Sequence, residues 1–149
     1  MTRHTLHEGK HHVHLLLAED NAVNQTLAVR ILEKRGYSVS VAPHGRAAFE
    51  AFQAGQFQLV LMDIQMPRMD GLEATAAIRE SEKLTGGHIP VVAMTANALV
   101  GDREKCIVAG MDAYVTKPIR TSELFAAIET LLGEKPKPQS TDDVTLLPM

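Results

Sequence analysis

The chain has 149 residues, of which 45% are apolar and 22% charged, as is ordinary for one globular domain with short tails. Its net charge of −3 argues against a generic nucleic-acid binder, which would present a basic face. No apolar run is long enough to span a membrane, the start of the chain is polar, and the single cysteine, Cys106, cannot form an internal disulfide. These features predict a cytoplasmic protein in a reducing compartment.

Residues 1–12 show no periodic apolar pattern and contain four histidines. We expect this segment to form a flexible arm, although its histidines could also chelate a transition metal. The histidines are His4, His7, His11 and His12.

From residue 13 to residue 133, short apolar runs alternate five times with segments of helical apolar spacing. The runs predict strands, because their length and continuity fit a strand buried on both faces. Helical spacing followed by glycine predicts the helices and several of their ends. Strands are expected at 13–18, 38–42, 58–62, 89–94 and 113–116, and helices at 22–35, 45–54, 72–84, 98–109 and 121–132.

This alternation predicts a doubly wound α/β fold, in which helices joined by right-handed crossovers cover both faces of a parallel sheet. The last stretch, residues 134–149, is rich in proline, lysine, serine and aspartate. It predicts a disordered tail or a linker. The predicted domain therefore covers residues 13–133.

Polar residues stand at the carboxyl ends of the predicted strands, where ligands bind in sheets of this kind. The first strand ends at Glu19 and Asp20, the third at Asp63, the fourth at Thr95 and the fifth at Lys117. Three carboxylates, one hydroxyl and one amine are therefore expected to converge at one rim of the sheet.

Clustered carboxylates repel one another unless a cation joins them. Oxygen ligands suit Mg²⁺, which typically takes one or two carboxylates together with water and a phosphate oxygen, and Mn²⁺ could substitute for it. A carboxylate can also act as the nucleophile that forms an acyl phosphate. Lys117 could pair with phosphate oxygens, and Thr95 could donate a hydrogen bond to one of them. The rim therefore predicts phosphoryl chemistry.

Four segments, LLLAEDN, LVLMDIQMPRMDG, VVAMTAN and YVTKPI, follow one another in this order. They resemble the signature segments of the bacterial response-regulator receiver family, and the resemblance covers the chain from about residue 13 to residue 133. It implies a flavodoxin-like (βα)5 sandwich with strand order 2-1-3-4-5. The stretches MDIQMPRMDGLEAT and AEDNAVNQ resemble receivers of hybrid sensor histidine kinases in particular.

The resemblance implies a role for each residue of the rim. Asp63 would accept a phosphoryl group from a phosphohistidine. Asp20, Asp63 and the backbone carbonyl of Gln65 would bind Mg²⁺ directly, and Glu19 would assist through water. Lys117 would contact the phosphoryl group.

The resemblance also implies a switch between two surfaces. Thr95 would move toward the phosphoryl group, and Tyr114 would turn inward as Thr95 moves, which reshapes the surface that partners contact. Gln65 and Asn97 would tune the lifetime of the acyl phosphate. The Lys117–Pro118 peptide bond would be cis, a geometry that proline makes accessible.

Other polar or flexible residues of the chain have ordinary structural interpretations. We expect Asp70 to cap a helix, Thr121 or Ser122 to cap the last helix, and Asp112 to belong to a turn. Gly71 is expected to act only as a turn residue.

The predicted function is that of a receiver domain whose partner is a histidine kinase phosphoacceptor domain or a histidine phosphotransfer domain. No contact with nucleic acid or membrane is expected. The isolated domain would catalyse only its own phosphorylation and slow dephosphorylation, so it would not be an enzyme acting on external metabolites. Its motifs favour a domain excised from a hybrid histidine kinase, with a stand-alone response regulator as the alternative.

Two further classes have a similar sheet. A magnesium-dependent aspartyl-phosphate hydrolase typically carries a second aspartate two residues after the nucleophile, and Gln65 at that position cannot act as a general acid. A flavin-binding module cradles phosphate with a loop rich in hydroxyls and glycine, whereas Glu19 and Asp20 would repel phosphate there. The sequence therefore favours the receiver over both.

Overall fold

The computed structural model describes residues 13–66, 69–96, 100–133 and 145–146, and the statements below concern these residues. Every predicted strand and helix is present, with ends within two residues of the prediction. The strands are β1 (His14–Ala18), β2 (Ser38–Ala42), β3 (Leu59–Asp63), β4 (Val91–Thr95), β5 (Ala113–Thr116) and β6 (Thr145–Leu146). The helices are α2 (Ala22–Lys34), α3 (Gly45–Ala54), α4 (Gly71–Thr85), α5 (Val100–Ala109) and α6 (Thr121–Leu131).

The strands form one sheet in the order β2-β1-β3-β4-β5-β6. Strands β1 to β5 pair in parallel, which confirms the predicted order 2-1-3-4-5. β6 adds to the outer edge of β5 in the antiparallel direction, with Tyr114 opposite Thr145.

Two residues of the segment predicted to be a disordered tail or linker, Thr145 and Leu146, form β6. A polar, proline-rich composition does not reveal such pairing, because the edge of β5 offers its backbone groups to any short extended segment. The other residues of the predicted tail, and the predicted arm at residues 1–12, lie outside the described residues.

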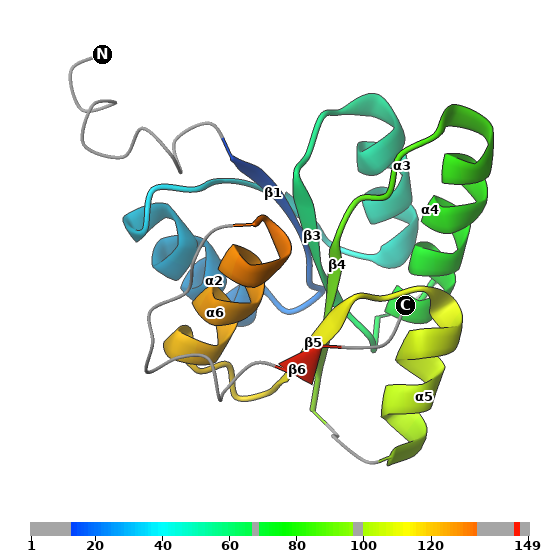
Figure 1. The fold of residues 1–149 in the computed structure, drawn as a ribbon. Coiled ribbons are helices and arrows are strands. Elements are labelled where there is room, and N and C mark those ends of the chain that lie inside the picture. The colour runs from blue at the N-terminus through cyan, green and yellow to red at the C-terminus, as the bar shows by residue number, and fades with distance from the viewer. Residues whose placement is uncertain (1–12, 67–68, 97–99, 134–144, 147–149) are drawn as a thin grey trace.

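Helices cover the two faces of the sheet unequally: α2 and α6 lie on one face, and α3, α4 and α5 lie on the other (Figure 1). Leu15 and Leu17 of β1 point into the core beneath α2 and α6, while Leu16 and Ala18 point into the opposite core. The central strands are therefore buried on both faces, which is why they appear in the sequence as continuous apolar runs.

Two helix starts test the predicted caps. Asp70 caps α4 in a capping box, since its carboxylate accepts the Glu73 backbone N–H at 2.8 Å and Glu73 accepts the Asp70 N–H at 3.1 Å. The prediction for α6 was wrong: the cap is Arg120, whose side chain makes no capping hydrogen bond. Its extended backbone starts the helix at Thr121, so the hydroxyls of Thr121 and Ser122 come too late in the chain to cap it.

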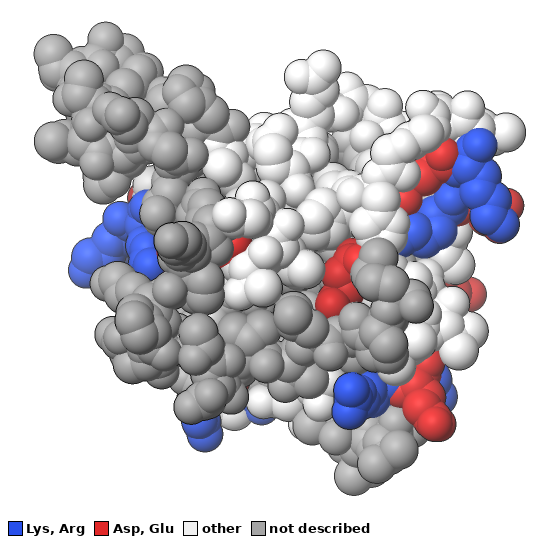
Figure 2. Space-filling view, viewed as in Figure 1, with Lys and Arg blue, Asp and Glu red and all other residues white. Residues whose placement is uncertain are grey.

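Acidic and basic side chains share the described surface. On the right-hand side of Figure 2, lysine or arginine side chains lie directly beside aspartate or glutamate side chains. Such mixing agrees with the small net charge of the chain. Within the described part of the chain, no helix has both the length and the apolar character required to cross a membrane.

Candidate functional site

The strand order reverses between β1 and β3, because the chain passes from β1 to β2 on one side and later to β3 on the other. Loops that leave the carboxyl ends of these two strands therefore diverge, and ligands bind in the crevice between them. Glu19 and Asp20 follow β1, and Asp63 is the last residue of β3. The register pairs Ala18 with Met62, which brings the three acids together.

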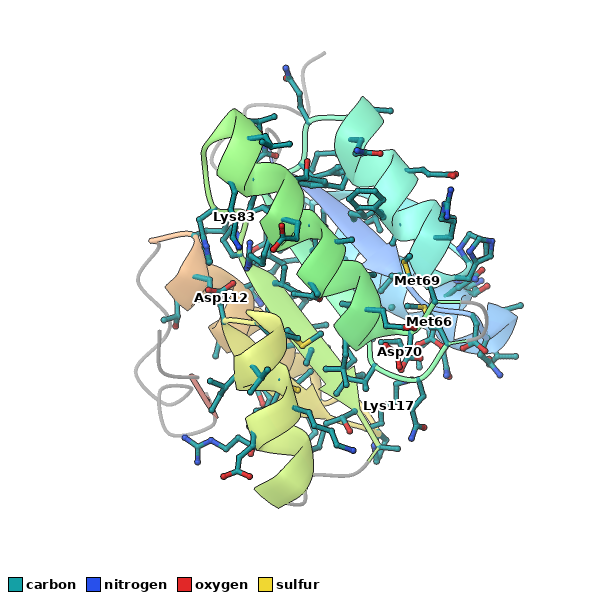
Figure 3. The ribbon with its side chains drawn as sticks, turned by 90° about the vertical axis from the view of Figure 1, so that its right-hand side faces the viewer. Met66, Met69, Asp70, Lys83, Asp112 and Lys117 are labelled. Atoms are coloured by element: carbon teal, nitrogen blue, oxygen red, sulfur yellow. The ribbon has the colours of Figure 1, made fainter. Side chains whose placement is uncertain are left out.

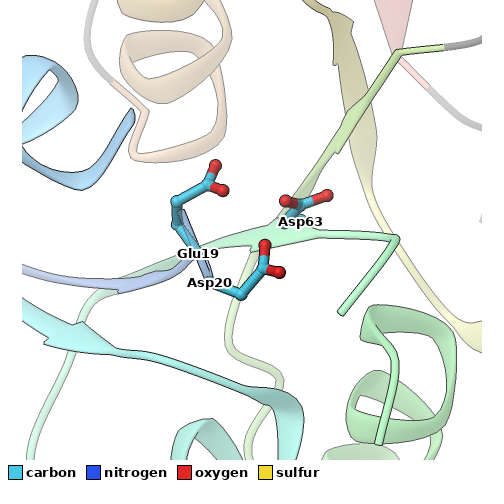
Figure 4. Close-up of side chains that lie close together, drawn as sticks. All are labelled: Glu19, Asp20 and Asp63. Carbon is cyan, nitrogen blue, oxygen red and sulfur yellow. The ribbon is translucent and has the colours of Figure 1, made fainter. Parts of the chain in front are cut away.

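The three carboxylates form a compact group (Figure 4). Glu19, Asp20 and Asp63 each offer an oxygen atom, and these atoms all lie within 4.8 Å of one another. Glu19 and Asp63 are buried, with 3% and 4% of their surface exposed, whereas Asp20 is exposed. Such crowding of like charges is favourable only with a cation among them.

Lys117 brings a positive charge to this group from the end of β5. Its ammonium Nζ lies 2.8 Å from Asp63 Oδ2 and 3.2 Å from Glu19 Oε1. Its backbone N–H donates to the carbonyl oxygen of Thr95 at 2.7 Å, which ties the end of β5 to the end of β4. The Lys117–Pro118 peptide bond is cis, as predicted.

Two opposing effects set the pKa of Lys117. Burial lowers this pKa, but the hydrogen bond and charge of Asp63, together with the charge and hydrogen bond of Glu19, outweigh burial. The pKa of Lys117 is therefore raised above its ordinary value of 10.5. Lys117 is a permanent cation of the site at neutral pH.

Backbone donors fix the remaining carboxylate oxygens. The Gln65 N–H donates to Asp63 Oδ1 at 3.1 Å, and the Asn21 N–H donates to Glu19 Oε2 at 3.2 Å. Each carboxylate oxygen can accept a further bond, so these contacts orient the group without saturating it. An all-oxygen set with one exposed carboxylate fits a hard divalent cation such as Mg²⁺. The residues present therefore fit the predicted metal.

A cleft of about 480 Å³ opens beside the carboxylates. A Cβ atom on Gly71 would collide with the carbonyl oxygen of Asp63, and the Gly71 N–H donates to the Ile64 carbonyl at 2.9 Å. Gly71 thus allows α4 to start directly against the end of β3, a role beyond the predicted turn. Seven residues line the cleft: Asp20, Ile64, Gln65, Met66, Asp70, Leu72 and Lys105.

The two residues of the predicted switch lie on neighbouring strands. Thr95 ends β4 and is 4% exposed, and Tyr114 lies in β5 opposite Ala93. The half-buried Tyr114 packs against the core cluster that contains Cys106 of α5. This placement suits a switch between the rim and α5, whereas the movement itself stays a prediction. Asn97, predicted to tune the lifetime, lies outside the described residues.

Asp112 does not behave as the predicted turn residue. It is 6% exposed and accepts bonds from Arg79 Nη2 at 2.8 Å, from the Val91 N–H at 2.8 Å, and from His88 Nε2, which lies 2.7 Å away. Arg79 Nη1 also pairs with Glu82 Oε1 at 2.7 Å. This group, here named the amino-end network, lies apart from Lys117, which pairs with Asp63 (Figure 3).

No sequence signal marked the amino-end network, because its members come from distant positions in the chain. Lys105 of α5 was also missed: it lines the cleft beside Asp20 and Gln65, although nothing in its local sequence points there. The amino-end network and the position of Lys105 both depend on tertiary packing, which brings separate helices and loops together.

Comparison with known proteins gives a consistent result. The family model described as "Response regulator receiver domain" matches residues 15–129. Hybrid signal transduction histidine kinase I of Dictyostelium discoideum is 46% identical over 121 residues, which cover 78% of this chain and 7% of that protein. The sensor histidine kinase GacS of Pseudomonas protegens is 43% identical over 116 residues, which cover 76% of this chain and 12% of that protein. The chain thus spans only a small part of these relatives.

Solved structures agree with the sequence relatives. The receiver domain of a sensor histidine kinase from Pseudomonas aeruginosa, solved with a magnesium ion in its active site cleft, is 38% identical with a TM-score of 0.75. The similarity covers 82% of this chain and 98% of that domain. The yeast receiver domain of Ssk1, solved with the histidine phosphotransfer protein Ypd1, is 31% identical with a TM-score of 0.72, over 80% of this chain and 86% of that chain.

Relatives are found beyond bacteria. They include histidine kinases of Dictyostelium, rice and Arabidopsis, so a bacterial origin, which the resemblance to the bacterial receiver family would imply, is not supported. The predicted family is confirmed by the family model that matches residues 15–129 and by relatives such as the Dictyostelium kinase that is 46% identical. Its fold, its site and these comparisons together show that the chain belongs to the response regulator receiver domain family.

Proposed function

We propose that Asp63 accepts a phosphoryl group from a phosphohistidine in a magnesium-dependent step of a phosphorelay. The observation that carries this proposal is the position of the Asp63 carboxylate. It lies 2.8 Å from the Lys117 ammonium and belongs to a group of three carboxylates whose ligand atoms lie within 4.8 Å of one another.

In the proposed reaction, a carboxylate oxygen of Asp63 attacks phosphorus from the side opposite the histidine nitrogen. A P–O bond forms as the P–N bond breaks, and the imidazole leaves with the electron pair of the broken bond. Bound Mg²⁺ would neutralise charge on the phosphoryl oxygens, held by Asp20, Asp63 and the carbonyl of Gln65. Lys117 stabilises negative charge that develops beside Asp63.

The domain therefore acts on itself, and its output is a changed surface near Thr95 and Tyr114. We favour a hybrid histidine kinase as the parent protein, because the chain matches a small part of several such kinases and nearly the whole of an isolated receiver domain. A stand-alone response regulator remains the alternative. The cytoplasmic location stays a prediction.

Phosphorylation by acetyl phosphate tests the proposal directly. In the presence of Mg²⁺, intact mass measurement is expected to detect one added phosphoryl group on the wild-type chain and none on Asp63→Asn. Glu80→Gln is the control, because Glu80 is exposed and pairs only with Lys83 among the ion pairs described for it. An unlabelled wild type, or full labelling of Asp63→Asn, would contradict the proposal.

An apolar surface beside the site supports a second proposal, concerning the phosphoryl donor. Val23 and Leu27 of α2 are 75% and 57% exposed. Leu27 lines a groove of about 440 Å³ that runs between α2 and α6 to Lys117. We propose that a histidine phosphotransfer domain docks here. A partner of this class is supported by the related yeast receiver, which was solved in complex with the histidine phosphotransfer protein Ypd1. Contact at this groove would bring the donor histidine to the rim.

The docking proposal predicts a selective loss of transfer. Val23→Ser with Leu27→Ser should slow phosphotransfer from a histidine phosphotransfer domain by about tenfold, while labelling by acetyl phosphate is unchanged. The matched control is Leu84→Ser with Val108→Ser, since these residues are 90% and 87% exposed on other helices. Equal transfer rates in the two double variants would contradict docking on α2.

A further inference from the structure

Two lysines lie near the carboxylate group in different electrostatic situations. Lys117 is engaged, because its ammonium contacts both Asp63 and Glu19. Lys105 of α5 lines the cleft of about 480 Å³, together with Asp20 and Gln65. Unlike Lys117, Lys105 is exposed and makes no ion pair or hydrogen bond with another described residue.

Negative charge dominates this cleft. Glu19, Asp20 and Asp63 form the carboxylate group, and Asp70 lines the cleft wall. The charge of Lys117 offsets only part of this. A phosphoryl group that carries two negative charges therefore approaches an acidic entrance, even after one divalent cation has bound.

Lys105 also lines a second hollow, a groove of about 620 Å³ between α4 and α5 that includes Leu72 and Val108. Leu72 and Lys105 are common to the cleft and the groove, so Lys105 lies where the two meet. Carboxylates line both hollows beside Lys105: Glu73 and Glu104 line the groove, and Asp20 and Asp70 line the cleft. Both pairs attract the Lys105 ammonium. A flexible ammonium at this junction can reach an anion that enters the cleft.

We propose that Lys105 is a donor-steering residue, whose charge attracts the dianionic phosphoryl group of the donor into the cleft before transfer to Asp63. This inference rests on the proposed function and adds a specificity determinant to the same site. The ligand class is a phosphoryl donor with a dianionic phosphoryl group, such as acetyl phosphate or phosphohistidine. Lys105 forms no bond in the reaction and acts before the chemical step.

Two measurements on one variant distinguish steering from a structural role, because steering predicts a lower labelling rate together with a higher metal affinity. Lys105→Gln should lower the second-order rate constant for labelling by acetyl phosphate about threefold at low salt and saturating Mg²⁺. The same variant should bind Mn²⁺ about threefold more tightly, because the substitution removes a positive charge near Asp20. Electron paramagnetic resonance measures this affinity. A loss of structure would weaken both properties together.

The design includes a charge series and a control. Lys105→Arg should keep the wild-type rate, and Lys105→Glu should be slower than Lys105→Gln. The rate differences should shrink near 1 M salt, where the Debye length is about 3 Å. Lys83→Gln is the control, because Lys83 lies on α4 away from the cleft (Figure 3) and should change neither property.

The possible outcomes separate this inference from the function on which it rests. Equal labelling rates for wild type and Lys105→Gln, or a rate and a metal affinity that fall together, would overturn donor steering and leave Asp63 as acceptor. A wild-type chain that acquires no phosphoryl group would overturn the proposed function and the steering role with it.

Discussion

The two ends of the same sheet both bury carboxylates beside a cation, yet they differ in how the charges are satisfied. At the amino end, Asp112 and Glu82 share Arg79, and each of their carboxylate oxygens has a partner at 2.6 to 2.8 Å. At the carboxyl end, Glu19 and Asp63 share Lys117. Figure 3 shows Asp112 and Lys117 apart in the molecule.

The difference lies in the surplus of negative charge. Asp20 adds a third carboxylate at the carboxyl end, exposed to the cleft, whereas His88 adds a further hydrogen-bonding group to Asp112 at the amino end. A buried charge is therefore not by itself a sign of function. Closely spaced carboxylates that keep room for another cation point to function, whereas a fully paired group stabilises the fold.

The largest expected effect comes from breaking the amino-end network. Asp112→Asn should lower the free energy of unfolding by about 3 kcal/mol, because it removes one of the two buried carboxylates that pair with Arg79. Chemical denaturation at neutral pH measures this change. The fraction of folded protein labelled by acetyl phosphate should not change, since the network lies apart from Lys117, which pairs with Asp63. A stability loss no larger than that of Glu80→Gln would contradict a structural role for the network.

Metal binding should have the next largest effect and should act only at the carboxyl end. Mg²⁺ at one hundred times its dissociation constant should stabilise the wild type by about 2.7 kcal/mol. Asp20→Asn should lose most of this gain, yet in metal-free buffer it should be at least as stable as the wild type, because one of three repelling charges is gone. Thermal unfolding with and without Mg²⁺ measures both effects, the lost stabilisation by metal and the unchanged or higher stability without it. A metal-free variant that is clearly less stable would contradict the repulsion.

The smallest effect concerns alkaline pH. The pKa of Lys117 is raised in the folded state, so its stabilising contribution is fully present below pH 10.5 and is lost as the pH rises through the folded pKa. The stability difference between wild type and Lys117→Gln should therefore be constant from neutral pH to about 10 and shrink above 10.5. Denaturation series at several pH values measure the difference, and a decline that begins at neutral pH would contradict the shift.

Much of the fold could be predicted because local pattern and global packing agree. Continuous apolar runs marked strands that are buried on both faces, and the rim acids were found because parallel strands all end at one edge. Glu19, Asp20 and Asp63 lie together as predicted, with Lys117 in contact with Glu19 and Asp63. The cap of α4 was predicted from the position of Asp70 just before Gly71 and the helical segment, and the capping box with Glu73 appeared only in the structure.

The missed features depend on contacts between distant segments. Asp112 meets Arg79 across 33 positions of the chain, and Gly71 is required by an approach to the backbone of Asp63. Lys105 faces the cleft because of how α5 packs beside α4, which no local pattern encodes. The prediction that Thr121 or Ser122 caps α6 failed because the extended backbone of Arg120 sets the start of the helix.

The antiparallel pairing of β6 has a consequence for the solution behaviour of the protein. A parallel sheet leaves its outermost strands with unpaired amide and carbonyl groups, which can join those of a neighbouring molecule. Here the chain places Thr145 and Leu146 against Tyr114 and Ala113, so that this stretch of the border is already occupied. The pairing of β6 therefore protects this part of the sheet edge from association with the edge of another molecule. The composition of the segment gives no sign of this role.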